Sequence, residues 1–201
     1  LVRDASTEDS RLVHFGVSGS HLLTKGDGVR FRARPESFLA PYLVDTGSLG
    51  GKSALGYGVE SALIEGPFSI QAEGLGSFTD DTANEDLHFF GGYVSASWML
   101  TGESRPYNRE SGVLSSIKPH HNFSIKNRSW GALEVAGRAS YTDLSDGTVR
   151  GGEMAILSVG LNCYLTKHHR VMFDGIMADV SERDTGNGDV FILQTRLQLE
   201  F

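Results

Sequence analysis

Three arginines at every second position, Arg30, Arg32 and Arg34, are the residues of this sequence best suited to binding chemistry. Apolar residues stand between them, so a β-strand would place the guanidinium groups on one face, about 7 Å apart. A planar guanidinium can donate two hydrogen bonds at once to a phosphate-like anion. The spacing therefore predicts a ladder for an anion, although a solvated basic face or a set of salt bridges would have the same pattern. The carboxylates that could form such salt bridges from other strands are Glu60, Glu73 and Glu134.

Further cations occupy comparable positions elsewhere in the chain. Arg138 and Arg196 fall in the polar phase of later alternating segments, so they could face the same side of a sheet as the first three arginines. Arg105 and Lys118 lie in a long irregular segment, residues 101–129, that is rich in Pro, His, Asn and charge. These four residues complete the set of candidate anion-binding groups.

The residue patterns that enzymes need are not evident. His120 and His121 are adjacent but have no further ligand at a fixed spacing, which argues against a metal site. No Ser-His-Asp order or phosphate-cradling glycine loop stands out, and the single cysteine, Cys163, falls in an apolar phase. We therefore expect no enzymatic activity, no metal and no cofactor.

The elements that must position these cations are β-strands, because apolar and polar residues alternate in at least eight segments. The clearest is the C-terminal stretch, where the terminal Phe201 is in phase with the apolar face. Turn signals join most segments, so the sequence predicts an antiparallel meander of nine or ten strands. We expect strands near 13–21, 29–34, 55–63, 68–73, 87–100, 133–141, 157–165, 171–177 and 190–201, with a short one near 113–118.

Segment length favours strands that cross a bilayer. Most of these segments run about 9 to 13 residues, which a tilted transmembrane strand needs, whereas strands in soluble proteins average ~5 to 6. No apolar run reaches the ~18 to 20 residues of a transmembrane helix. The mean hydropathy of -0.19 fits strands with one wet face, and 25 glycines with 11 phenylalanines suit an all-β chain. The net charge of -7 argues against nucleic acid as a partner.

Several blocks of the sequence are similar to one protein family. In order, they are GVRFRARPES followed by DTG, SALIEGPFSIQAEG, SASWMLTGESRPYN, WGALEVAGRASYTDL, GGEMAILSVGLNCYLTKHHRVMFD and LQTRLQLEF. Together they resemble the C-terminal half of the phosphate-selective porin O and P family, and the LTGE-S-R-P block followed by G-A-x-E-x-A-x-R is the most specific. Leu133 and Cys163 depart from the family pattern, where tryptophans are expected.

The resemblance implies an all-β antiparallel transmembrane β-barrel, in which residues 1–201 are one partial domain of a sixteen-stranded wall. It implies a porin of the bacterial outer membrane that gives passive, anion-favouring diffusion, with phosphate or polyphosphate as candidate solutes. The 101–129 segment could fold inward as a pore-constricting loop. The expected partners are outer-membrane lipid, small inorganic anions and, at full length, further copies in a homotrimer. The expected pore-lining residues are Arg30, Arg32, Arg34, Arg138, Arg196, Arg105 and Lys118.

Two other classes of protein have to be separated from this one. A soluble lipocalin-like or sandwich β protein could enclose a small apolar ligand with the same apolar faces, and detergent-free solubility would identify it. A membrane β-barrel enzyme would need a nucleophile and a base near one rim, and the sequence offers neither. Because Leu1 is preceded by no initiator methionine or secretory signal, we expect the chain to be processed or to be a piece of a longer protein.

Overall fold

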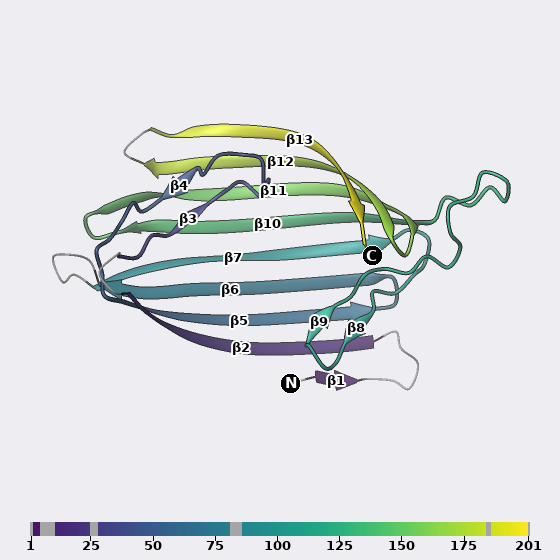
Figure 1. Ribbon diagram of the computed structural model, residues 1–201, viewed down its shortest axis with the longest axis horizontal. Helices are drawn as coiled ribbons and strands as arrows, with labels where there is room; N and C mark the ends of the chain where they lie inside the picture. The colour runs from purple at the N-terminus through teal and green to yellow at the C-terminus, as the bar shows by residue number, and fades with distance from the viewer. Residues whose placement is uncertain (1, 5–10, 25–27, 81–85, 184–185, 201) are drawn as a thin grey trace.

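The computed structural model describes residues 2–4, 11–24, 28–80, 86–183 and 186–200, which form one large antiparallel sheet and two small ones (Figure 1). Each strand of the large sheet pairs with the next along the chain, apart from two inserted segments, so the predicted meander is confirmed. Phe201 lies outside the described residues. Among those residues, no helix is long and apolar enough to span a membrane. The strand order is β1 (Val2–Asp4), β2 (Arg11–Leu23), β5 (Ser53–Glu65), β6 (Phe68–Asp80), β7 (Asp86–Met99), β10 (Ala132–Asp146), β11 (Val149–Thr166), β12 (His169–Arg183) and β13 (Gly188–Leu199).

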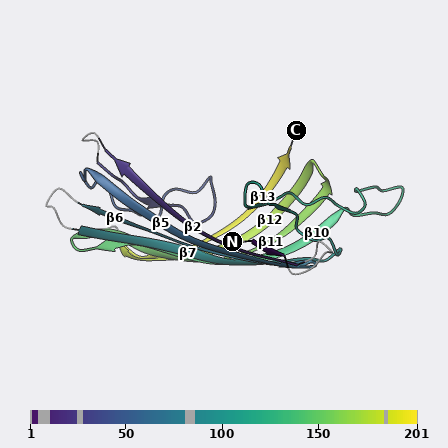
Figure 2. The same cartoon turned by 90° about the horizontal axis from the view of Figure 1, so that it is seen from below.

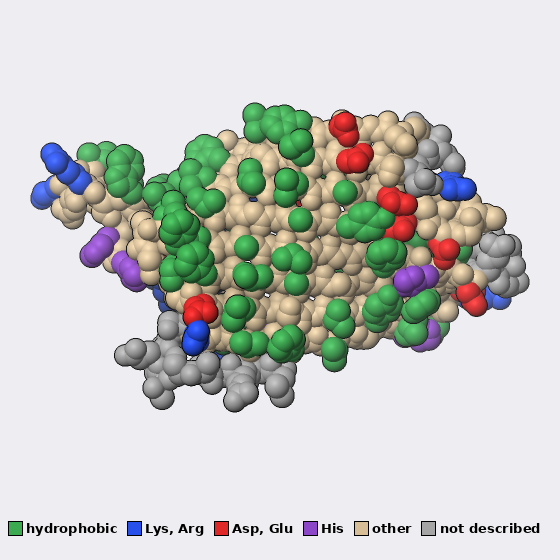
Figure 3. Space-filling model, turned by 180° about the vertical axis from the view of Figure 1, so that it is seen from behind, with side chains coloured by type: hydrophobic (Ala, Val, Ile, Leu, Met, Phe, Trp, Pro, Cys, Tyr) green, Lys and Arg blue, Asp and Glu red, His purple; other side chains and the backbone are tan. Residues whose placement is uncertain are grey.

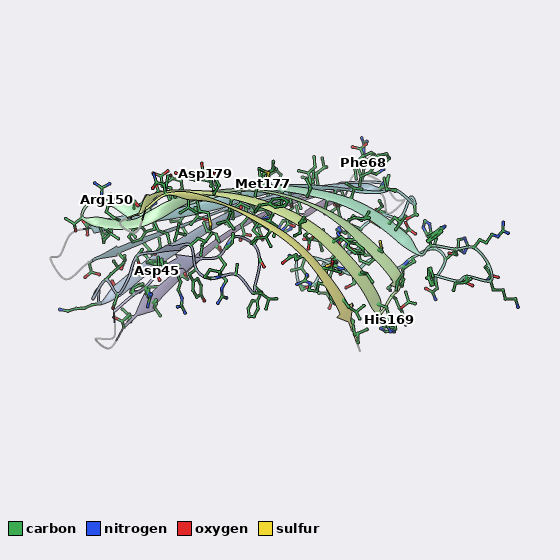
Figure 4. The ribbon with its side chains drawn as sticks, turned by 90° about the horizontal axis from the view of Figure 1, so that it is seen from above. Asp45, Phe68, Arg150, His169, Met177 and Asp179 are labelled. Carbon is green, nitrogen blue, oxygen red and sulfur yellow. The ribbon has the colours of Figure 1, made fainter. Side chains whose placement is uncertain are left out.

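The two faces of the large sheet differ in polarity, as the alternation predicts. Val135, Leu157 and Met177 are 45%, 56% and 61% exposed on the convex face, which carries apolar side chains across its whole area (Figure 3). Side chains labelled in Figure 4 show the same division, because Phe68 and Met177 point outward while Asp45 lies on the concave side. A sheet with an exposed apolar face of this extent matches a wall that contacts lipid.

The large sheet is an open trough and does not close into a barrel (Figure 2). Among the described residues, β13 pairs only with β12, and β1 covers only three residues of β2, at Leu12 to His14. The described residues therefore form part of a wall. Its eight long strands contain 12 to 18 residues each, and most of them are longer than the alternating segments in the sequence predict.

The prediction that residues 29–34 form a strand of the wall is wrong. Only β3 (Arg32–Ala33) is a strand there, and it pairs with β4 (Val44–Asp45) in a separate two-stranded sheet on the concave side of the trough. The reason is physical: alternation records that one face of a segment is apolar, but it does not record whether lipid or another part of the protein covers that face.

A second insert occupies the long connection between β7 and β10. Its strands are β8 (Tyr107–Asn108) and β9 (Val113–Leu114), which pair with each other and not with the wall. The short strand expected near 113–118 is thus limited to two residues. Both inserts lie on the concave side of the large sheet (Figure 2).

The two buried apolar clusters lie where the inserts contact the wall. The larger one lies beneath residues 29–49, and the smaller one joins Ile117 of the second insert to the ends of β7, β10 and β11. The larger cluster consists of Val44, Leu49, Leu87, Phe89, Leu144, Met154, Ile156, Ile176, Ala178 and Val180. The smaller cluster consists of Met99, Ile117, Ala132 and Tyr164.

Candidate functional site

Residues 29–49, called the inner hairpin below, form the element that carries the arginine ladder. Its two arms are joined by backbone hydrogen bonds of 2.9 Å from Thr46 N to Phe31 O and from Leu49 N to Val29 O. The ring of Phe31 packs on that of Phe89 in the wall, with centroids 5.4 Å apart. The apolar face of the predicted strand therefore packs against the concave side of the wall, and the arginine face is left for the space inside the trough.

The three ladder arginines have different partners. Arg30 donates from Nε to Oδ1 of Asp45 at 2.8 Å, and this bond lowers the pKa of Asp45 below its ordinary value. The guanidinium carbons of Arg32 and Arg34 each lie 4.0 Å from the centroid of the Tyr42 ring. Within the described part of the chain, neither forms an ion pair with a carboxylate. Two of the three guanidiniums are thus held by an aromatic ring and not by a carboxylate, although Asp45 also interacts electrostatically with Arg32.

The tip of the inner hairpin is fixed to the wall by Glu36. Its carboxylate accepts hydrogen bonds from Ser140 Oγ at 2.7 Å and from Ser158 Oγ at 2.6 Å, and it forms an ion pair with Arg138 Nε at 2.7 Å. Arg138 also stacks over the ring of Tyr93 at 3.7 Å. Glu36 has a φ of 53°, a left-handed conformation that is unfavourable for a residue with a side chain. This strain is tolerated where one carboxylate joins the hairpin to two strands of the wall.

A cavity of about 720 Å³ lies between the inner hairpin and the wall. Arg32, Arg34 and Arg138 contribute to its lining, together with Glu36 and Glu73. It is large enough to admit a hydrated inorganic anion, and it places guanidinium groups from two separate elements around one space.

The second insert is tied to the concave side by polar contacts. Arg105 forms a salt bridge with Glu134, a buried residue of β10 that also accepts a hydrogen bond from Tyr164 at 2.8 Å. Tyr107 contacts Nδ1 of His14, on β2, at 2.6 Å. The positive charge of Arg105 is therefore paired with a buried carboxylate, at a site separate from the inner hairpin.

The structure brings together four of the seven predicted residues, namely Arg30, Arg32, Arg34 and Arg138, around the inner hairpin. The other three lie elsewhere. Arg196 is on the concave face of β13 with Nη2 3.4 Å from Sδ of Met172, Lys118 is exposed in the second insert, and Arg105 is paired as described above. A pore-lining role for all seven stays a prediction. Among the described side chains, no group of three or more His, Cys, Asp or Glu could hold a metal ion.

Two side chains of the candidate site, Glu36 and Tyr42, were not predicted from the sequence. Their roles depend on contacts with other elements, and no local motif marks them. A weaker signal was present in the wall, because some strands carry apolar residues in both phases near one end, as where the inward Phe89 precedes the outward Phe90 and the inward Ile156 precedes the outward Leu157. These inward apolar residues form the surface on which the inner hairpin packs.

Long antiparallel strands, an apolar convex face and charged inserts on the concave face define a class of protein: the wall of a transmembrane β-barrel with inward-folded loops. The chain belongs to the family described as "Phosphate-selective porin O and P", whose model matches residues 5–201. The predicted family is thus confirmed, and with it a location in the bacterial outer membrane and the expected lack of enzymatic activity. The alternatives of a soluble binding module and of a barrel enzyme are not supported.

Two curated relatives are similar to most of the chain. An uncharacterised protein of Caulobacter vibrioides is 28% identical over 198 residues, which cover 94% of this chain and 39% of that protein. Porin O of Pseudomonas aeruginosa is 30% identical over 144 residues, covering 66% of this chain and 32% of that protein. The chain therefore spans between about a third and two fifths of the length of these relatives.

Proposed function

We propose that the full-length protein containing this chain gives passive, anion-favouring diffusion through a water-filled outer-membrane barrel, with phosphate or polyphosphate among its solutes. One observation carries this proposal. Arg32 and Arg34 are held beside Tyr42 on the inner hairpin, on the concave side of the wall, without a paired carboxylate among the described residues. Guanidinium groups in that position would attract anions and repel cations.

The arrangement favours passage over tight binding. A permeating ion must be attracted strongly enough to enter and weakly enough to leave, which a few guanidiniums facing a wide aqueous space can provide. Arg138, on the opposite side of the cavity, is partly neutralised by Glu36. The field of the site then depends mainly on Arg32 and Arg34, opposed by the carboxylate of Glu73, which also lines the cavity.

The net charge of -7 does not contradict an anion pore. Asp179 and Asp189 are paired across β12 and β13 on the convex face, outside the trough. On the concave side, Asp45 and Glu134 are each paired with an arginine. Since charges act mainly within a Debye length of about 8 Å, the selectivity of the pore depends on local charges near its narrowest part.

The test is the double substitution Arg32→Gln and Arg34→Gln in the full-length protein, measured in planar bilayers under a salt gradient. A unit charge at about 4 Å in water is worth ~1 kcal/mol, so the ratio of anion to cation permeability should fall at least about fivefold. Arg11→Gln is the matched control, because Arg11 pairs with Glu65 at the end of β2 and should leave the ratio unchanged. An unchanged zero-current potential in the double variant would show that the inner hairpin does not line the conducting path.

Two further features belong to the same proposal. The second insert, within the 101–129 segment, would narrow the pore from the concave side, since Arg105 and Tyr107 fasten it to the wall. Assembly as a homotrimer is also proposed, on the resemblance alone, and cross-linking of the full-length protein in its native membrane tests it.

A further inference from the structure

The connection between β7 and β10 ends in a small hairpin, residues 121–130, called the rim hairpin below. Ser124 and Ser129 exchange two backbone hydrogen bonds of 2.9 and 3.0 Å, and Asn127 N donates to Ser124 Oγ at 3.2 Å. Arg128 completes the turn with a φ of 52°, a left-handed conformation that glycine adopts more easily. The rim hairpin projects beyond the ends of the strands (Figure 1).

The base of the rim hairpin is fastened to the end of the wall. Phe123 N donates to the carbonyl oxygen of Leu165, close to the end of β11, at 2.7 Å. The rings of Phe123 and Trp130 lie 6.4 Å apart across this base. Gly131 follows with a φ of 78°, and a Cβ atom there would lie 2.2 Å from the carbonyl oxygen of Tyr164, so the backbone passes the wall closely. The aromatic pair therefore lies at the level where the strands end.

The exposed side chains of the rim hairpin are apolar and cationic. Ile125 is 84% and Trp130 72% exposed, and Lys126 and Arg128 lie between them in sequence. No Asp or Glu occurs from 118 to 131, in a chain whose net charge is -7. Figure 3 shows hydrophobic side chains of this region on the same face as those of the wall, with Lys and Arg at the far end.

This order of side chains matches the order of environments at a bilayer surface. Hydrocarbon contacts the apolar wall, the interface favours aromatic rings, and Lys and Arg reach the level of the phosphate groups. Ile125 and Trp130 would leave water on entering the interface, and each Lys or Arg near an anionic surface is worth about 1 kcal/mol.

We infer that the rim hairpin is an interfacial anchor that binds the anionic phospholipid headgroups around the barrel, with Phe123 and Trp130 at the interface and Lys126 and Arg128 at the phosphates. The inference rests on the outer-membrane location and goes beyond the proposed solute selectivity. The connection between β7 and β10 would then have two roles. The rim hairpin would bind lipid, and the rest of the second insert would narrow the pore.

The experiment places a nitroxide label at Ile125→Cys in the full-length protein, with Cys163 and any other cysteine changed to Ser. The protein is reconstituted in phosphatidylcholine vesicles with and without phosphatidylglycerol. With phosphatidylglycerol, we expect the label to be protected from a water-soluble paramagnetic reagent and accessible to oxygen. Each of Lys126→Gln and Arg128→Gln should lower the equilibrium constant for this insertion about fivefold. Lys52→Gln is the matched control, because it removes an exposed cation that precedes β5, at the end of the wall opposite the rim hairpin.

Two results would overturn the inference. The first is equal exposure of the label to the water-soluble reagent with and without phosphatidylglycerol. The second is protection that persists in detergent without lipid, because the rim hairpin would then contact a second copy of the chain and not headgroups. Neither result bears on ion selectivity, so the proposed function would stand or fall separately.

Discussion

Arg30 and Arg32 lie on the same face of the inner hairpin and carry the same charge, yet their surroundings give them different electrostatic effects. Asp45 forms a hydrogen-bonded ion pair with Arg30, whereas Arg32 lies over the ring of Tyr42 and interacts with Asp45 only through space. A cation over an aromatic face gains about 0.5 to 2 kcal/mol and keeps its outward field. The pairing of each arginine therefore matters more for the pore than the number of arginines.

At the residue scale, Asp45→Asn should release the charge of Arg30. Asparagine keeps the Oδ1 atom that accepts the hydrogen bond from Gly47 N, so the turn should survive. We expect the zero-current potential of the full-length protein to move further toward the anion limit in planar bilayers. Asp189→Asn on the convex face removes the same charge outside the trough and should have no effect.

The same pair sets a pH dependence. The Arg30 hydrogen bond depresses the pKa of Asp45 below 3.8, so the pair is intact above pH 3.8 and is lost as pH falls through the depressed value. In the wild-type protein, protonation of Asp45 breaks the pair in that acidic range, and the released charge of Arg30 should then raise anion selectivity. The Asp45→Asn variant should lack this component of the titration, and an identical acidic rise in both proteins would assign the change to another group.

At the scale of the element, the inner hairpin is held in two ways. Its apolar face packs on the wall around Phe89 and Met154, and its tip is fastened by the single carboxylate of Glu36. Buried apolar side chains contribute ~1.5 to 3 kcal/mol each, whereas a hydrogen bond to a charged group contributes about 1.5 to 3 kcal/mol. The apolar cluster thus keeps the hairpin on the wall, and Glu36 restricts the motion of its tip.

Glu36→Ala should leave the hairpin attached but free its tip. We expect the open-channel current noise of single pores to rise and anion selectivity to increase, because Arg138 loses its counter-charge. Ser158→Ala is the matched control, since it removes one of the three contacts and retains the ion pair. Noise equal to that of the wild type in Glu36→Ala would show that the apolar packing alone fixes the tip.

The elements differ in how far the sequence predicts them. The wall strands follow from alternation that in most cases continues over about nine or more residues, and β10 with its exposed Val135 and buried Glu134 is a clear case. The six residues at 29–34 alternate equally well but do not belong to the wall. Local periodicity identifies the apolar face of such a segment and contains no information on its partner, here Phe89, which is 58 residues away from Phe31 in the chain.

Of the candidate site, only the cationic residues could be predicted from the sequence. Residue type and spacing indicate Arg30, Arg32 and Arg34 as anion-binding groups. Their pairing could not be predicted, because Glu36 reaches Ser140 and Ser158 across 104 and 122 residues of sequence. Such contacts are properties of the folded sheet and its curvature.

At the scale of the whole molecule, the described residues form a wall with two free edges. β13 has one unpaired side, and β2 is covered by β1 only over Leu12 to His14. Exposed strand edges at bilayer depth leave backbone groups without hydrogen bonds, at a cost of several kcal/mol each. The chain also covers well under half of the length of its curated relatives.

The isolated 201-residue chain should therefore not form an ordinary pore. On refolding in detergent, we expect aggregates or dimers joined through β2 or β13, as measured by light scattering coupled to size-exclusion chromatography. The full-length protein refolded in the same detergent is the control. A stable monomer of the 201 residues with porin-like conductance would contradict the interpretation of this sheet as part of a larger wall.

The dry layer under the inner hairpin has a consequence for the reach of its charges. Val44 and Leu49 are almost fully buried there, so water is excluded where the second arm of the inner hairpin packs on the wall, beside the cavity that Arg32 and Arg34 line. A low-dielectric backing polarises little and directs the field of the two guanidiniums toward the aqueous side. The apolar packing thus limits the water around one side of the site, and the two cations influence a passing ion over a longer range than they would on a hairpin surrounded by water on every side.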